Sequence, residues 1–249
     1  MTVEFILLAF GLFFVVALLY SSVGHAGATG YLAIMALLSF PVDSIKGTSL
    51  VLNILVSAIG TYRFLKAGYF DKKVFLTFAV TSIPIAFVGG AMQIEPKLFK
   101  LLAGIFLMLS AVLLIGKNYL VKPKDEEPKQ IPLVPGLGIG AAIGFLSGLI
   151  GVGGGVFLSP IMILMNWTTV KKASGVAALF ILCNSVTGLI GHLSKLQTVD
   201  NNIGYWAVAV IIGGLIGSYL GTSKFSNKVI LAVLALVLLS AGYKFVFVG

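Results

Sequence analysis

Charge is scarce in this sequence: only 10% of its 249 residues are charged, whereas 59% are hydrophobic. A soluble domain carries about 25% charged residues, so this chain lacks the polar surface that water requires. We therefore expect an all-α integral membrane protein that has the lipid bilayer as its main partner. The net charge of +9 does not indicate nucleic-acid binding, because the Lys and Arg residues lie in short connections and form no basic groove.

Reactive and metal-binding side chains are also few. The sequence has one cysteine, Cys183, and two histidines, so an intramolecular disulfide is excluded and no metal-ligand spacing exists. We predict no catalytic residue, metal or cofactor, since an intramembrane enzyme needs a nucleophile with a base or a set of metal ligands. Acidic residues occur only at segment ends or in connections, which argues against a cation as cargo. Glu4, Asp43, Asp71, Glu95 and Asp200 lie near segment ends or in short connections, and the other three of the eight acidic residues lie in the linker.

Ten apolar segments are separated into two groups of five by one charged stretch. We interpret residues 117–132 as a solvated cytoplasmic linker, residues 1–116 as a first transmembrane repeat and residues 133–249 as a second. No Lys or Arg precedes the first apolar run, so it is expected to be a retained span rather than a secretory signal. The segments run over 3–20, 28–40, 47–65, 74–93, 97–116, 133–149, 155–166, 173–191, 203–221 and 228–248.

The two groups align with each other. Gly24 falls opposite Gly151 and Gly27 opposite Gly154, and Ser57 falls opposite Ser185 in the third segment of each group. An ancestral duplication is the economical explanation. The second segment of each repeat is too short for a bilayer core, which needs about 20 helical residues. Each repeat is therefore predicted to contain a glycine-interrupted helical hairpin, with one short or half helix, followed by three transmembrane helices.

The orientation of the repeats follows from how often the hairpin crosses the membrane. If it crosses an even number of times, the second repeat is inverted, and loops 62–73, 117–130, 166–172 and 222–228 share one face. These loops hold most of the Lys and Arg residues, so the positive-inside rule favours inverted-topology repeats over parallel ones. The linker is then cytoplasmic and both termini lie outside.

Two glycine runs, "GHAGATG" (24–30) and "GVGGG" (151–155), each precede a short segment. Irregular backbone at membrane depth occurs where it is buried in protein or lines a polar cavity, and matched glycine-interrupted segments indicate a transporter's binding site. A helix N-terminus favours an anion through its unpaired N–H groups and its dipole. We predict substrate binding here, and packing of close helices is the alternative. The candidates are Gly24, His25, Gly27, Thr29, Gly151, Gly153, Gly154 and Gly155.

Polar residues in the third segment of each repeat extend this candidate site. Ser49 and Asn53 share a helical face, and Asn184 and Ser185 lie in the matching segment. Each Asn is a candidate for ligand contact or for an interhelical hydrogen bond. His25 suits an anion donor with proton coupling, or a plain hydrogen bond to backbone. Lys46 is interpreted as a solvated loop lysine, with attraction of an anion to a vestibule as the alternative.

The stretch "GFLSGLIGVGGGVFLSPIMIL" resembles the signature of the TauE/SafE sulfite-exporter family, also called TSUP, and the first repeat carries the looser "SSVGHAGATGYLAIMAL". The resemblance covers the whole chain. It implies a multi-pass transporter of the cytoplasmic (inner) membrane for small sulfur-containing anions, such as sulfite, sulfonates, thiosulfate-like or related organosulfur species. It also implies binding at the glycine turns, with Asn184 and Ser185 as a polar pair. Alternating access of the two repeats is the expected mechanism.

Two alternatives remain open at this point. A passive anion channel, or a permease for another small organic anion, would have the same fold and the same sequence features. The small-residue face "GGLIGSYLG" (213–221) can pack either within the chain or against a second copy in a homodimer.

Overall fold

The computed structural model describes residues 2–22, 25–120, 128–196, 198–220 and 227–248. Within them the chain is helical and contains no β-strand, which confirms the all-α prediction. A π-helical turn, η1 (Lys244–Val248), ends the described chain. The helices are α1 (Val3–Ser22), α2 (Ala28–Leu37), α3 (Val42–Lys66), α4 (Lys72–Ala91), α5 (Pro96–Leu120), α6 (Leu133–Ile150), α7 (Gly155–Leu164), α8 (Val170–Ser194), α9 (Ile203–Leu220) and α10 (Asn227–Tyr243).

Seven helical stretches in the described residues are long and apolar enough to cross a membrane, namely α1, α3, α4, α5, α6, α8 and the stretch Leu231–Val248 of α10 with η1. The multi-pass membrane prediction is thereby confirmed. Helices α2 and α7 have 10 residues each. At 1.5 Å per residue each is about 15 Å long, or half a bilayer core, as their segment lengths predicted. Helix α9 was predicted to cross the membrane, but its described part is slightly shorter than a full membrane span.

Each short helix returns to the end of the molecule where the preceding long helix began. The ring of Phe5, at the start of α1, lies 5.7 Å from that of Phe40, just after α2. In the second half, the Lys129 amide ahead of α6 donates to the Asn166 carbonyl after α7, at 2.7 Å. The pairs α1–α2 and α6–α7 are therefore hairpins.

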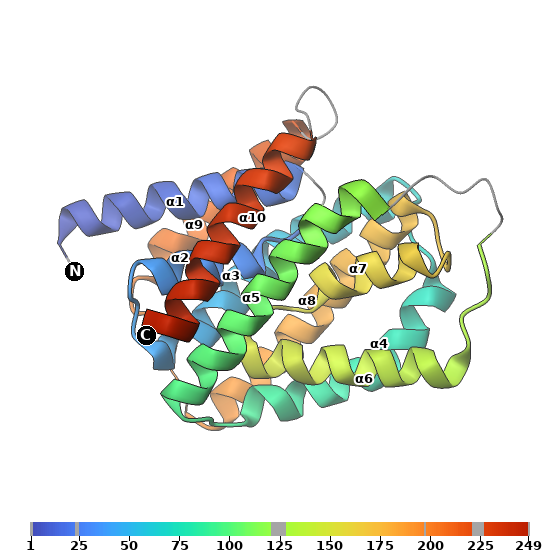
Figure 1. Ribbon diagram of the computed structural model, residues 1–249, viewed down its shortest axis with the longest axis horizontal. Coiled ribbons are helices and arrows are strands. Elements are labelled where there is room, and N and C mark those ends of the chain that lie inside the picture. Colours follow the sequence, from blue (N-terminus) through green and yellow to red (C-terminus); the bar gives the residue numbers. More distant parts are fainter. Residues whose placement is uncertain (1, 23–24, 121–127, 197, 221–226, 249) are drawn as a thin grey trace.

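The connections gather at two opposite ends of the helices. At one end, the Lys244 amino group donates to the Leu37 carbonyl and Gln93 donates to the Lys195 carbonyl. We call this end the terminal face, defined by residues 38–41, 92–95 and 198–202, because both labelled termini lie toward it in Figure 1. The linker residues near 130 lie at the other end of the view. Helix α3 runs between the two ends.

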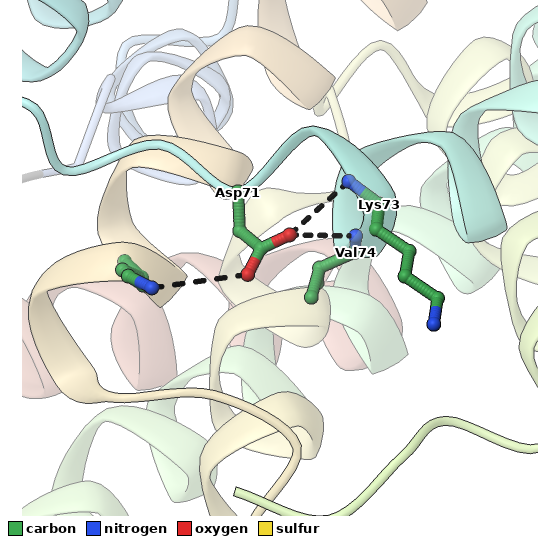
Figure 2. A network of polar contacts seen from close by, with 4 residues as sticks. Asp71, Lys73 and Val74 are labelled. Atoms are coloured by element: carbon green, nitrogen blue, oxygen red, sulfur yellow. Dashed lines mark hydrogen bonds and ion pairs between the residues drawn. The ribbon is translucent and has the colours of Figure 1, made fainter.

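The opposite end, which we call the linker face, is defined by residues 67–71, 128–132 and 165–169. Asp71 begins α4 here: one carboxylate oxygen accepts from the amides of Lys73 and Val74, both at 3.1 Å (Figure 2). This is an N-cap, which satisfies orphan amides of the first turn. The other oxygen faces Lys172 of α8 at 4.0 Å, and the pair is partly exposed.

Glycine rows bring helices of the two halves into backbone contact. A Cβ atom on Gly144 of α6 would collide with the Ser82 carbonyl of α4, and Gly140 and Gly148 lie equally close to α4 carbonyls. Gly217 of α9 lies in the same way on the Leu18 carbonyl of α1. Close approach through small residues is how membrane helices pack without a hydrophobic drive. The described part of the "GGLIGSYLG" face thus packs within the chain.

The pairs α1–α9 and α4–α6 flank the molecule on opposite sides, with α5 and α10 crossing between them in opposite directions (Figure 1). Helices α3 and α8 form the centre, since 61% and 56% of their spans are buried, more than in the other described spans. They run antiparallel, because Asn53 contacts Ser185 whereas Gly60 lies beside Ala178. This central pair carries most of the candidate site.

Candidate functional site

The two half-length helices begin in the same way. Gly27 is the N-cap of α2 with φ 93°, and Gly154 is the N-cap of α7 with φ 77°. Both backbones are left-handed, a conformation that a residue with a Cβ adopts only at a cost. Neither residue offers a side chain to the first-turn amides. Each helix therefore presents its positive N-terminal end without a side-chain cap, which is the arrangement that favours an anion.

The described parts of the two glycine runs lie side by side. The Ser49 hydroxyl of α3 donates to the Gly151 carbonyl at 2.7 Å and lies 3.5 Å from the Ala28 carbonyl. His25 Nε2 lies 3.5 Å from the hydroxyl of Ser159 on α7. Gly24 falls outside the described residues. Ser49 thus links the start of α2 to the turn that precedes α7.

A layer of amides and hydroxyls lies next to these turns. Asn53 Nδ2 donates to the Ser185 hydroxyl at 2.9 Å, and Gly153 packs directly on both side chains. Asn184 Oδ1 accepts from the Ser82 hydroxyl at 2.9 Å. All four polar side chains are fully buried. The predicted residues Ser49, Asn53, Gly153 and Ser185 are therefore brought together from the two halves of the chain.

Two amide groups in this layer have unused hydrogen-bonding capacity. Asn53 Oδ1 and Asn184 Nδ2 have no partner among the described residues, although both side chains are fully buried. The hydroxyl of Ser147, beside Gly154, is also buried without a hydrogen-bond partner among the described residues. A buried polar atom without a partner costs about 1–3 kcal/mol. The layer is therefore better suited to holding a polar ligand than to holding helices together alone.

Two of the predicted site residues, Thr29 and Gly155, contact neighbouring helices instead of the polar layer. The Thr29 hydroxyl lies 2.8 Å from the Tyr20 hydroxyl of α1, and both are fully buried. A Cβ on Gly155 would collide with the side chain of Ile181. Gly151 ends α6 with φ 89° and lies against the Lys46 backbone. In this conformation Thr29 and Gly155 serve helix packing.

Three hydroxyls at the site were not anticipated from the sequence: Ser82, Ser147 and Ser159. Ser147 stands among the glycines of α6, in "LSGLIG", and this small-residue pattern is the signal that marks it as facing another helix. Ser82 and Ser159 lie in helices α4 and α7 with no comparable pattern. Their role depends on which helix packs against them, which the local sequence does not contain.

Lys46 differs from its interpretation as a solvated loop residue. Helix α3 begins at Val42, five residues earlier than the apolar segment, so Lys46 lies inside the helix. Its side chain is 5% exposed, and its amino group donates to the carbonyls of Gly90 and Met92, both at 2.9 Å. His192, near the end of α8, is also fully buried, and its Nε2 lies 2.8 Å from the Thr198 carbonyl.

Two cavities flank the polar layer along α3. The first, about 230 Å³, lies along the C-terminal half of α3 toward the linker face, and its wall includes His25, Ser57 and Arg63. None of the described residues of 151–155 lies on this wall. The second, about 340 Å³, lies at the terminal face, and its wall includes Lys46 and Gln93. Each holds several molecules of the size of water, which occupies about 30 Å³ in the liquid.

Comparison with known proteins gives a consistent result. The sequence matches the family described as "Sulfite exporter TauE/SafE" over residues 9–245. It is 38% identical to "Probable membrane transporter protein y4hK" of Sinorhizobium fredii over 236 residues, which cover 93% of this chain and 94% of that protein. No solved structure matches.

More distant relatives carry similar descriptions. "Probable membrane transporter protein MJ0441" of Methanocaldococcus jannaschii is 31% identical over 177 residues, covering 68% of this chain and 65% of that protein. "Probable membrane transporter protein YunE" of Bacillus subtilis is 26% identical over 225 residues, covering 82% and 80%. With its helical hairpins, its buried polar layer and a family match over nearly its whole length, the chain belongs to the TauE/SafE family of multi-pass membrane transporters.

Proposed function

We propose that the chain carries small sulfur-containing oxyanions, such as sulfite, sulfonates or thiosulfate-like species, across the cytoplasmic membrane. The observation that carries the proposal is the convergence of two uncapped helix N-termini, α2 and α7, on one layer of buried hydroxyls and amides. Among the described residues, the layer offers hydrogen-bond donors, including the unpaired Asn184 Nδ2, and no carboxylate. Donors and positive dipole ends favour an anion. The family description supports a sulfur oxyanion.

Alternating access is the proposed mechanism, with residues 1–116 and 133–249 as inverted repeats. Three features of the packing support it. Helix α1 pairs with α9 as α6 pairs with α4, and each pair joins the first helix of one half to the fourth of the other. The matching helices α3 and α8 run antiparallel. Each hairpin returns to the face where it began, which supports an odd number of crossings in each half when the other three helices, α9 included, all span the membrane.

The direct test is uptake of labelled sulfite, thiosulfate and a small sulfonate into proteoliposomes. We expect saturable uptake that unlabelled sulfur oxyanions inhibit and that chloride does not. Gly154→Ala should reduce uptake strongly, because the left-handed backbone costs about 1–2 kcal/mol with a Cβ and the added atom meets Ile143. Gly138→Ala is the matched control, since nothing lies within 4 Å of its Cβ position on α6.

The same vesicles separate a transporter from a passive channel. A transporter exchanges labelled for unlabelled anion across the membrane, so preloading with unlabelled anion should accelerate uptake of label. Flux that rises linearly with concentration and ignores preloading would favour a channel. The proposed substrate class would be overturned if the vesicles took up another organic anion but none of the sulfur oxyanions.

His25 is the proposed residue for any proton coupling, because its imidazole lines the first cavity and contacts α7 through Ser159. In a coupled cycle, His25→Gln should abolish the effect of an imposed pH gradient on uptake while leaving anion exchange intact. An unchanged response to the gradient would assign His25 to hydrogen bonding alone.

A further inference from the structure

Lys46 occupies an unusual place for a lysine in a membrane span. It lies on the same face of α3 as Ser49 and Asn53, one turn nearer to the terminal face. Its amino group donates to two carbonyls at the C-terminal end of α4, Gly90 and Met92. That end is the negative pole of the helix dipole, so it attracts a cation. The lysine therefore fastens the start of α3 to the end of α4.

The terminal-face cavity is lined by Lys46 and by Met92, one of the two residues whose carbonyls bind the lysine. Its wall includes Asp43, Lys46 and Gln93, with Asp43 exposed at the mouth and Lys46 buried behind it. The residues of the polar layer are absent from the wall as far as the described chain shows, although Ser49 is less than one helical turn beyond Lys46. Lys46 and the two carbonyls that hold it thus stand between the cavity and the layer.

The cavity toward the linker face is different in this respect. Its wall continues inward to His25 and Ala26, in the first glycine run. Arg63 on its wall is partly buried, and its guanidinium makes no hydrogen bond or ion pair with the described residues. The linker-face cavity thus contains the unbound guanidinium of Arg63 and reaches the first glycine run. The terminal-face cavity instead contains the buried amino group of Lys46, which is bound to backbone carbonyls.

We propose that the terminal-face cavity is an access site for a small oxyanion, and that Lys46 is both its ligand and its gate. In the present conformation the carbonyls of Gly90 and Met92 occupy the amino group and close the route to Ser49. An oxyanion arriving from the terminal face replaces these carbonyls as the partner of Lys46, which releases the end of α4 and opens the route. Lys46 thus contacts the oxyanion directly in this step, and the inference rests on the anion transport proposed above.

Transport measurements test the ligand part of this proposal. We expect Lys46→Met to reduce uptake by at least about tenfold, since hydrogen bonds from a charged group are the stronger ones. Lys46→Arg, which keeps the charge and the donors, should retain a larger share of uptake. Lys97→Met is the matched control: it removes an exposed charge at the same face and should leave uptake near normal.

Thiol labelling tests the gate without any need for transport. Cys183 is the only cysteine of the sequence, so Cys183→Ala with Ser49→Cys creates a single reporter just beyond Lys46. An impermeant methanethiosulfonate is added to each face separately, in vesicles of either orientation. We expect slow labelling from the terminal face when Lys46 is present. Adding Lys46→Met should accelerate it severalfold, while labelling from the linker face changes little.

The outcomes separate this inference from the proposed function. Normal uptake in Lys46→Met with unchanged labelling of Ser49→Cys overturns the gate and leaves anion transport standing. Lack of sulfur-anion uptake in the unmodified chain overturns the proposed substrate, and the labelling result then decides the gate alone. If Lys46→Met fails to fold, Lys46→Gln takes its place in both assays, because it keeps one donor without the charge.

Discussion

Only one of the two polar groups in the side-chain amide of Asn53 makes a hydrogen bond with the described residues. The Nδ2 group donates to Ser185, while Oδ1 is buried with no partner among the described residues. A helix-joining asparagine is expected to have both groups satisfied, since an unsatisfied buried group costs about 1–3 kcal/mol. At the scale of single residues, the site therefore combines bonds that hold α3 to α8 with atoms left free.

This imbalance gives a prediction about stability and function together. Asn53→Leu has a similar shape and removes the unpaired oxygen, and Ser185 can turn its hydroxyl to a carbonyl of its own helix. We expect the free energy of unfolding to stay within about 1 kcal/mol of the unmodified value or to rise, while anion uptake is lost. Thermal unfolding in detergent and vesicle uptake measure the two effects.

Thr187→Val is the control for this variant, because the Thr187 hydroxyl donates, within the described part of the chain, only to carbonyls of its own helix, α8. It should leave both stability and uptake nearly unchanged. If Asn53→Leu instead lowers stability by several kcal/mol and keeps uptake, Asn53 is a helix-joining residue and not a ligand.

At the scale of helices, the row of glycines on α6 determines how close α4 can come. Gly140, Gly144 and Gly148 face successive carbonyls of α4, and the packing of this pair sets the position of Ser82 beside Asn184. A side chain anywhere in the row would separate the two helices.

Gly144→Ala should therefore lower the free energy of unfolding by about 1–3 kcal/mol, as overpacking of a close interface does. The new Cβ would collide with the carbonyl and the hydroxyl of Ser82. Gly138→Ala, on the same helix but facing open space, should be neutral or stabilising by about 0.5–1 kcal/mol. Thermal unfolding of the two variants compares them directly, and equal melting temperatures would contradict the role of the row.

At the scale of the whole molecule, the connections divide into a terminal face and a linker face. Described basic residues are more frequent toward the linker face, where Arg63, Lys66, Lys72, Lys73, Lys129, Lys171 and Lys172 lie, than toward the terminal face. The positive-inside rule assigns the more basic face to the cytoplasm. The mechanism proposed above needs this arrangement, because inverted repeats place the linker and the C-terminus on opposite sides.

Reporter fusions test that arrangement. A fluorescent protein that matures only in the cytoplasm should be bright when inserted after Gly68 or within the linker, and dark when fused after Val248. Alkaline phosphatase, which is active only outside, should give the reverse pattern. The same signal from the linker and from the C-terminus would contradict inverted repeats.

Much of the helical layout could be predicted from the sequence, because apolar run lengths and glycine punctuation are local signals. The half-length helices 28–37 and 155–164 are the clearest example. The start of α3 could not be placed this way: its first turn is polar, and only burial against α4 makes Lys46 part of the interior. The hydrogen bond from Ser82 to Asn184 could not be predicted from the sequence either, since it joins residues 102 positions apart through tertiary packing.

The glycine rows on α6 and α8 have a mechanical consequence for α4. Gly144 of α6 and Gly191 of α8 lie against backbone carbonyls of α4, and Gly90 of α4 lies against the Gly188 carbonyl of α8. The carbonyls that bind Lys46 belong to the same α4. Any change in the position of α4 between α6 and α8 would therefore also move the binding partners of that lysine.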